Sequence, residues 1–209
     1  MYLFSIYSKY LITVSIVHIV FLSGRYSPPV SCFHTFQRRE RIRSRMVLFF
    51  LYLKAELENV ESVAIRSDAK LRIDVANPLN DFEKRDKVVV DPTELEEAED
   101  SKVTPYHFGL KWEGQNHKIS TLTVKTREEV KTLLKKKKNA DSLHEAYTPD
   151  DSGDWVALLA VECRGMEPKA FHPMGDEFVV TSNGGKTFDE DIDLGEGDWA
   201  DYDEDADGK

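Results

Sequence analysis

Short segments in which apolar and polar residues alternate constrain this chain more than any other feature. Alternation with a period of two occurs in residues 51–57, 70–75 and 118–124, and residues 155–163 form a longer apolar run. The turn sequence at 183–185 predicts a hairpin that follows a strand at 177–181. A period of two places every second side chain on one face of a strand, and a continuous apolar run is typical of a strand buried on both faces. We therefore predict a mainly β fold.

A weak internal repeat indicates how these strands are organised. Residues 53–64 and 159–170 both have the pattern of a strand that leads into a turn, and they share the identities Leu53/Leu159, Glu56/Glu162, Glu61/Glu167 and Ala64/Ala170. A lobe made from half of this chain would bury little apolar surface by itself. We therefore predict two similar, pseudo-symmetric β lobes that pack as one unit over residues 46–204.

Two segments carry signals for the start of a helix. Residues 91–99 have a proline early and acids in the first turn, and residues 126–134 begin with a threonine that Glu129 follows three positions later. We expect one or two short helices at the periphery of the β unit.

Residues 1–45 differ in composition from the rest of the chain, with an apolar run at 11–22 and an arginine-rich stretch at 38–45. The run is shorter than the roughly 20 residues of a membrane-spanning helix, but it is long enough for the core of a signal peptide. We expect an arm outside the folded domain, either disordered, signal-like, or an upstream extension of a chain whose translation starts at Met46. A start at Met46 favours a cytoplasmic location, whereas a signal or anchor at 11–22 favours a secretory or membrane-anchored one.

Charge and cysteine content exclude several classes of function. The formal net charge is -10, and the acids gather towards the C-terminus, where residues 205–209 form the end of an acidic tail. An acidic domain repels phosphate backbones, so we expect no nucleic-acid partner. The two cysteines, Cys32 and Cys163, are too few for a disulfide framework or for a four-thiolate zinc site within one chain.

One long motif carries a family resemblance. It spans residues 161–173 and continues into segments 188–194 and 197–204, and it resembles the C-terminal half of the eukaryotic CXXC-motif-containing zinc-binding proteins. The residues that carry the resemblance are Glu162, Cys163, Arg164, Gly165, Glu167, Pro168, Phe188, Ile192, Leu194, Trp199, Tyr202 and Asp203. The resemblance implies a small protein of two similar β lobes without known catalytic residues.

The resemblance also implies a zinc ion held by two Cys-x-x-Cys pairs, yet this chain contains no Cys-x-x-Cys. The positions that correspond to the four ligands hold Val75, Pro78, Gly109 and Trp112, and none of these side chains binds zinc. We therefore expect no metal and no other cofactor. A lobe without zinc needs other stabilisation, which we expect from the burial of Val75 and Trp112.

A substituted ligand set remains an alternative, because Asp74 adjoins the first of these positions and His107 and His117 flank the second. It would make the chain a zinc-binding protein with a mixed nitrogen and oxygen site.

A second alternative is a thiol-dependent enzyme or redox protein that uses Cys163, whose pKa Arg164 would lower, with His172 downstream. However, Cys163 ends an apolar strand, where a free cysteine usually behaves as a small buried hydrophobe. We therefore predict a non-enzymatic binding or scaffold protein that acts on another protein.

Overall fold

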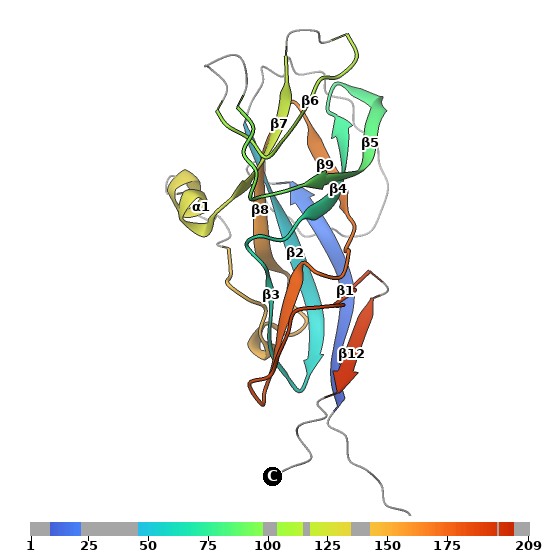
Figure 1. The fold of residues 1–209 in the computed structure, drawn as a ribbon, viewed down its shortest axis with the longest axis vertical. Coiled ribbons are helices and arrows are strands. Elements are labelled where there is room, and N and C mark those ends of the chain that lie inside the picture. The colour runs from blue at the N-terminus through green and yellow to red at the C-terminus, as the bar shows by residue number, and fades with distance from the viewer. Residues whose placement is uncertain are drawn as a thin grey trace, which may run out of the picture.

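The protein is an elongated, mainly β molecule with one short α-helix among the described residues, which confirms the predicted fold class (Figure 1). The computed structural model describes the backbone of residues 9–21 and all atoms of most residues in 46–97, 104–114, 118–134, 143–195 and 197–202. Its strands are β1 (Lys9–Phe21), β2 (Val47–Glu58), β3 (Val60–Ile65), β4 (Leu71–Asn77), β5 (Asn80–Val90), β6 (Phe108–Leu110), β7 (Ser120–Lys125), β8 (Val156–Arg164), β9 (Glu167–Phe171), β10 (Phe178–Ser182), β11 (Thr187–Phe188) and β12 (Asp198–Tyr202).

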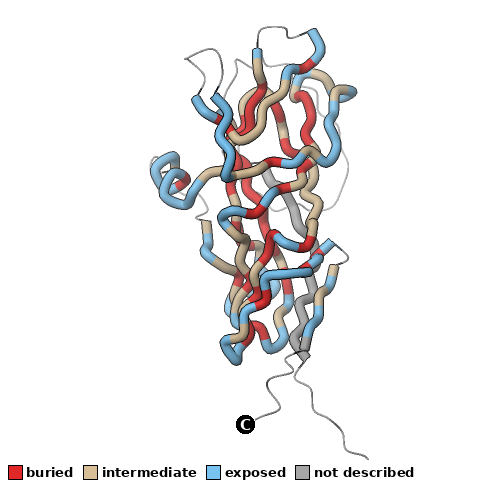
Figure 2. Tube along the Cα trace, in the orientation of Figure 1, coloured by how far each residue is buried: buried red, intermediate tan, exposed pale blue. Residues whose placement is uncertain are grey.

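A six-stranded antiparallel sheet forms the length of the molecule, in the order β12-β1-β2-β8-β7-β6. The long strands β2 and β8 lie at its centre and pair from Val47 opposite Cys163 to Leu53 opposite Val156. Half of the residues of β2 and most of those of β8 are buried, and this explains why β8 has the sequence of an apolar run (Figure 2).

Two three-stranded sheets cover different ends of the six-stranded sheet. The sheet β5-β4-β9 defines the upper lobe, and the sheet β11-β10-β3 defines the lower lobe (Figure 1). The lobes do not correspond to the two halves of the chain, because β3 pairs with β10 and β9 pairs with β4. Each lobe therefore contains strands from both copies of the sequence repeat, which the repeat alone did not indicate.

Each lobe has its own buried apolar cluster. The upper cluster comprises Phe49, Leu71, Ile73, Val75, Val90, Trp112, Leu122, Val161, Cys163 and Met166. The lower cluster comprises Leu53, Ala55, Val60, Val63, Tyr147, Val156, Leu158, Phe178, Val180, Phe188, Ile192 and Leu194. Because β2 and β8 contribute to both clusters, the two lobes share a continuous central pair of strands.

The helix α1 (Arg127–Leu134) forms where the sequence predicted it. The Thr126 backbone N–H donates to Glu129 Oε2 at 2.9 Å, and the Glu129 N–H donates to Thr126 Oγ1 at 3.4 Å, which is the expected capping box. Val130 is the buried residue of α1 and packs with Phe50 and Tyr52 of β2. The helix thus covers a limited part of the sheet.

The helix expected near residues 91–99 does not form over its described part, 91–97. Asp91 Oδ1 instead accepts hydrogen bonds from the backbone N–H and the hydroxyl of Thr93, at 2.9 and 2.6 Å. This aspartate turn competes with a helix for the same backbone groups. Glu96 then forms an isolated bridge with Tyr106. A short 3₁₀ turn at Pro149–Asp151 is the other helical element among the described residues.

The N-terminal segment differs from the expected separate arm. Residues 9–21, which include most of the apolar run, form β1 and pair with both β2 and β12. The alternative of a signal or anchor was based on apolar content, but a β-branched run also suits the interior of a sheet. Among the described residues, no helix is long and apolar enough to cross a membrane. The arginine-rich stretch at 38–45 lies outside the described residues.

Candidate functional site

The four positions predicted to correspond to zinc ligands lie on or next to β4 and β6. Val75 on β4 is fully buried, and Trp112, two residues after β6, is 2% exposed. Both belong to the upper apolar cluster, as expected from their sequence. The Trp112 indole N–H donates to the Gly165 carbonyl oxygen at 2.8 Å, and the Arg85 guanidinium lies 5.8 Å from the centre of the indole ring. The lobe is therefore closed here by packing and by a hydrogen bond.

Pro78 lies in the turn between β4 and β5, beside a polar network. The side-chain amides of Asn77 and Asn80 donate to the two carboxylate oxygens of Glu83, at 2.7 and 2.9 Å. The side-chain oxygen of Asn77 accepts the Leu79 N–H at 2.9 Å. This network, which we call the hairpin clip, was not predicted, although asparagines around a proline are an ordinary turn signal.

Gly109 lies on β6 and leaves no room for a side chain. A Cβ atom placed there would lie 2.5 Å from the ring of Tyr106 and 2.9 Å from Ile119 Cδ1. A cysteine at this position therefore requires the Tyr106 ring to move. None of the four side chains offers a donor atom for zinc, and packed groups fill the positions of Val75 and Trp112 and the space beside Gly109, so these residues do not fit the metal.

Two of the three alternative ligands, His107 and Asp74, are engaged elsewhere. His107 Nδ1 accepts the Val124 backbone N–H at 2.9 Å, and burial together with nearby Lys125 lowers the pKa of His107. Asp74 Oδ1 accepts the Lys87 N–H at 2.7 Å and lies 2.9 Å from His172 Nε2. His117 lies outside the described residues. Among the described residues, no group of three or more His, Cys, Asp or Glu side chains could hold a metal ion.

Cys163 is buried in the upper cluster and is 1% exposed. Burial raises the pKa of its thiol, and the charges of Glu162 and Glu167 add to the effect. Arg164 does not activate the thiol, since its guanidinium donates to Glu162 Oε1 at 2.9 Å. The idea of a thiolate at neutral pH is therefore not supported by the surroundings of Cys163.

Glu162 is the centre of an ion cluster on β8. Glu162 Oε2 lies 3.3 Å from Lys125 Nζ, and Glu162 Oε1 contacts the guanidinium of Arg164. Lys125 Nζ also lies 3.2 Å from Glu129 Oε1. The Glu162 side chain is only 9% exposed, and burial disfavours a charged carboxylate. Lys125 and Arg164 offset this cost by pairing with it. The cluster links β7, β8 and α1.

The other residues of the motif form turns and anchors. Gly165 has a φ of 71°, and its carbonyl accepts hydrogen bonds from Trp112 and from Ser120 Oγ, the latter at 2.9 Å. Glu167 lies 2.7 Å from Lys169 Nζ, and Pro168 is buried on β9. These residues position the end of β8 beside the loop that carries Trp112.

The aromatic and aliphatic part of the motif anchors the C-terminal segment to the lower lobe. Phe188, Ile192 and Leu194 are buried in the lower cluster. Trp199 packs edge-on against Phe188, with the ring centres 5.4 Å apart. Tyr202 ends β12, where only its backbone is described, and Asp203 lies outside the described residues together with 205–209.

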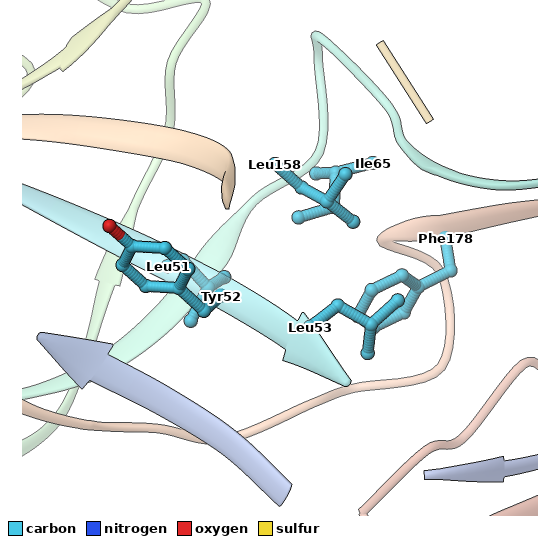
Figure 3. Close-up of a pocket in the computed structure, with 6 residues that line it drawn as sticks. All are labelled: Leu51, Tyr52, Leu53, Ile65, Leu158 and Phe178. Atoms are coloured by element: carbon cyan, nitrogen blue, oxygen red, sulfur yellow. The ribbon is translucent and has the colours of Figure 1, made fainter. Parts of the chain in front are cut away.

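An apolar crevice between β2, β3, β8 and β10 does not add a ligand site. Figure 3 shows its lining side chains, Leu51, Tyr52, Leu53, Ile65, Leu158 and Phe178. The space between them does not admit a molecule the size of water. This crevice is therefore part of the packed lower lobe.

The molecule is thus a two-lobed antiparallel β protein, and two solved structures share this fold. A hypothetical protein from Plasmodium falciparum matches with a TM-score of 0.59 and 24% identity, over 79% of this chain and 91% of the other. The crystal structure of C1orf123 matches with a TM-score of 0.58 and 20% identity, over 77% of this chain and 89% of the other.

The chain belongs to the eukaryotic family of CXXC motif containing zinc binding proteins, whose family profile matches residues 50–209. The UPF0587 protein CG4646 of Drosophila melanogaster is 41% identical over 64 residues, which are 31% of this chain and 39% of that protein. The CXXC motif containing zinc binding protein of Xenopus laevis is 42% identical over 67 residues, which are 32% and 41% of the two chains. The matched segments thus span about two fifths of these relatives' length.

Proposed function

We propose that this chain is a non-enzymatic binding or scaffold protein in which packed residues have replaced the zinc site of its family. The observation that carries the proposal is the filling of three of the four predicted ligand positions: Val75 and Trp112 belong to one buried cluster, and the site of a Gly109 side chain is occupied by Tyr106. The buried state of Cys163 supports a role without thiol chemistry. We also propose a cytoplasmic location, which suits the free thiol of Cys163.

Metal content and stability test the loss of zinc. We expect the purified full chain to contain well under one zinc per molecule, and a chelator to leave its unfolding midpoint unchanged. Stoichiometric zinc that resists dialysis would overturn the proposal and would direct attention to His107, His117 and an intermolecular Cys163 site.

Substitution of Trp112 tests what stabilises the lobe in place of the metal. Trp112→Ala removes the largest buried side chain of the site and should lower the free energy of unfolding by about 3–5 kcal/mol. The matched variant Trp112→Phe keeps the apolar contact but loses the hydrogen bond to Gly165, and it should cost only about 1–2 kcal/mol. Equal midpoints for the wild type and Trp112→Ala would show that Trp112 packing does not stabilise the lobe.

The hairpin between β4 and β5 supports a binding role, since Phe82 is 96% exposed and Leu79 is 63% exposed beside the hairpin clip. Large apolar side chains presented on a fixed turn are typical of contact residues. Affinity capture from a eukaryotic extract should yield a protein partner with the full chain and with Asp81→Ser, but not with Phe82→Ser. A partner retained by Phe82→Ser would exclude this hairpin, and failure to find any partner would count against a scaffold.

A further inference from the structure

The six-stranded sheet is symmetric about the line between β2 and β8. Outward from β8 lie β7 and then β6, and outward from β2 lie β1 and then β12. All neighbouring strands are antiparallel on both sides. Beyond β2 and β8 the chain turns at Asn59 and at Gly165, which occupy the same place in the sequence repeat and have similar positive φ angles of 60° and 71°.

The two three-stranded sheets follow the same symmetry. On β4, Ile73 pairs with Phe171, and on β10, Phe178 pairs with Ile65 at the corresponding position. Val75 and Val180, two residues further along each strand, are both fully buried. The middle strands are therefore both buried at these two positions, and their registers agree at Ile73 and Phe178. At Val75 and Val180 the registers differ by one residue, because the pairing of β4 shifts after Asp74. The fold is therefore an intertwined duplication of a unit of six strands, with β2 to β7 as the first unit.

The second unit has β8 to β12 in the places of β2 to β6, and the place of β7 is filled by β1. The registers agree closely. Thr123 of β7 lies opposite Glu162 of β8, and Thr13 of β1 lies opposite Glu56 of β2. The two glutamates coincide in the sequence repeat, and a valine follows each threonine.

The outer neighbours agree as well. Phe108 of β6 lies opposite Leu122, the residue before Thr123, and Trp199 of β12 lies opposite Ile12, the residue before Thr13. An aromatic residue therefore occupies the matching position on each outer strand. Agreement on both neighbours distinguishes this arrangement from an arbitrary strand laid along a sheet edge.

Chain order is where the two units differ. β7 follows β6 along the chain, whereas β1 precedes the whole domain. Yet Lys9, the first residue of β1, lies opposite Tyr202, the last residue of β12. β1 therefore begins where a strand that followed β12 through a hairpin would begin, and it runs in the same direction.

We infer that the sheet position between β2 and β12 is a strand-binding site of the second unit, and that residues 9–21 of the same chain fill it in place of a strand after β12. The segment is then the permuted last strand of the duplication. Without it, the inner edges of β2 and β12 present unpaired backbone groups, which are costly when buried and bind other strands when exposed.

Cysteine pairs placed across the register of β1 with β2 and with β12 test this inference in the full chain. In a Cys32→Ser background, Thr13→Cys combined with Glu56→Cys should oxidise to an intramolecular disulfide, and so should Thr13→Cys combined with Asp198→Cys. Glu58 lies two residues out of register from Thr13 on the same strand, so Thr13→Cys with Glu58→Cys is the matched control. The first pair should form roughly tenfold more disulfide than the control, since a diagonal separation exceeds disulfide geometry.

The partners of Thr13 on β2 and β12 are exposed, so these variants should fold. Equal cross-linking of the register and control pairs would overturn the inference, as would a disulfide that forms only between two chains. Hydrogen exchange gives a readout without mutation. Amides of residues 9–21 should exchange as slowly as those of the counterpart strand at 120–125, and exchange at the rate of an unstructured peptide would also overturn the inference.

Discussion

Burial decides the chemistry of Cys163. The sequence offered two interpretations, a reactive thiol beside Arg164 or a buried apolar group, and the structure places the thiol in the upper cluster with Arg164 bound to Glu162. Arg164 follows Cys163 in the sequence under both interpretations, so its presence does not distinguish them. The direction in which its guanidinium points depends on Glu162, which the fold holds on the other face of β8.

In a Cys32→Ser background, Cys163 should therefore react with iodoacetamide at least about 100-fold more slowly in the native protein than in denaturant, because the thiolate forms only when the lobe opens. Rapid native alkylation would instead favour the thiol-dependent enzyme. The rates can be followed by mass spectrometry.

Asp91 gives a stability that depends on pH. The hydroxyl and the N–H of Thr93, together with Lys70 at 3.0 Å, lower the pKa of Asp91 to about 2. A carboxyl group whose pKa is lower in the folded state contributes stability above its unfolded pKa and loses it as the pH falls through the folded pKa. The contribution of Asp91 to the free energy of unfolding should therefore be lost as the pH falls from about 4 to about 2.

A carboxyl-carbon NMR titration should place the midpoint of Asp91 near this low value. The variant Thr93→Val removes the hydroxyl and should move the pKa of Asp91 up towards its ordinary value. An unchanged midpoint in Thr93→Val would show that the hydroxyl does not hold the carboxylate.

At the scale of elements, the turn between β4 and β5 depends on the hairpin clip. Glu83→Ala leaves the amides of Asn77 and Asn80 without their acceptor, and Asn77 is buried, so the variant should lose about 1–3 kcal/mol of unfolding free energy. The exposed neighbour Asp81 is the control, and Asp81→Ala should stay within about 0.5 kcal/mol of wild type. Chemical denaturation measures both, and equal losses would mean that the clip does not stabilise the hairpin.

Local signals predicted elements well where no distant partner competed. The capping box of α1 and the hairpin turn at 183–185 involve residues within a few positions of each other, and both form as predicted. The helix expected at 91–99 was wrong over 91–97, because Asp91 bonds to Thr93 and Glu96 to the distant Tyr106. Residues 9–21 were assigned outside the domain because their partners, β2 and β12, lie far away in the sequence.

At the scale of the whole molecule, the exchange of strands between the repeats should make the two lobes unfold together. Val75 and Val180 are buried equivalents in the upper and lower lobes, and truncation of either to alanine should cost about 1–3 kcal/mol. Because β3 pairs with β10 and β9 with β4, each variant should shift the unfolding of both lobes equally.

Trp112 reports on the upper lobe and Trp199 on the lower, so versions that keep one of these two and carry phenylalanine at the other tryptophan positions separate the two signals. Each valine variant is compared with the parent that has the same single tryptophan, because Trp112→Phe itself lowers stability. Coincident transitions are expected. A Val180→Ala change that shifts only the Trp199 signal would show that the lobes are independent.

The period-two pattern, which predicts the β class, and the absence of any Cys-x-x-Cys are properties of residue order, so both can be read from the sequence. The sequence also contains the motif that is typical of the family. The pairing of the strands, the shared core of Trp112 and Val75, and the place of β1 in the sheet are visible only in the folded molecule. These features depend on contacts between residues far apart in the chain, and a local sequence pattern does not indicate which of those contacts are favourable.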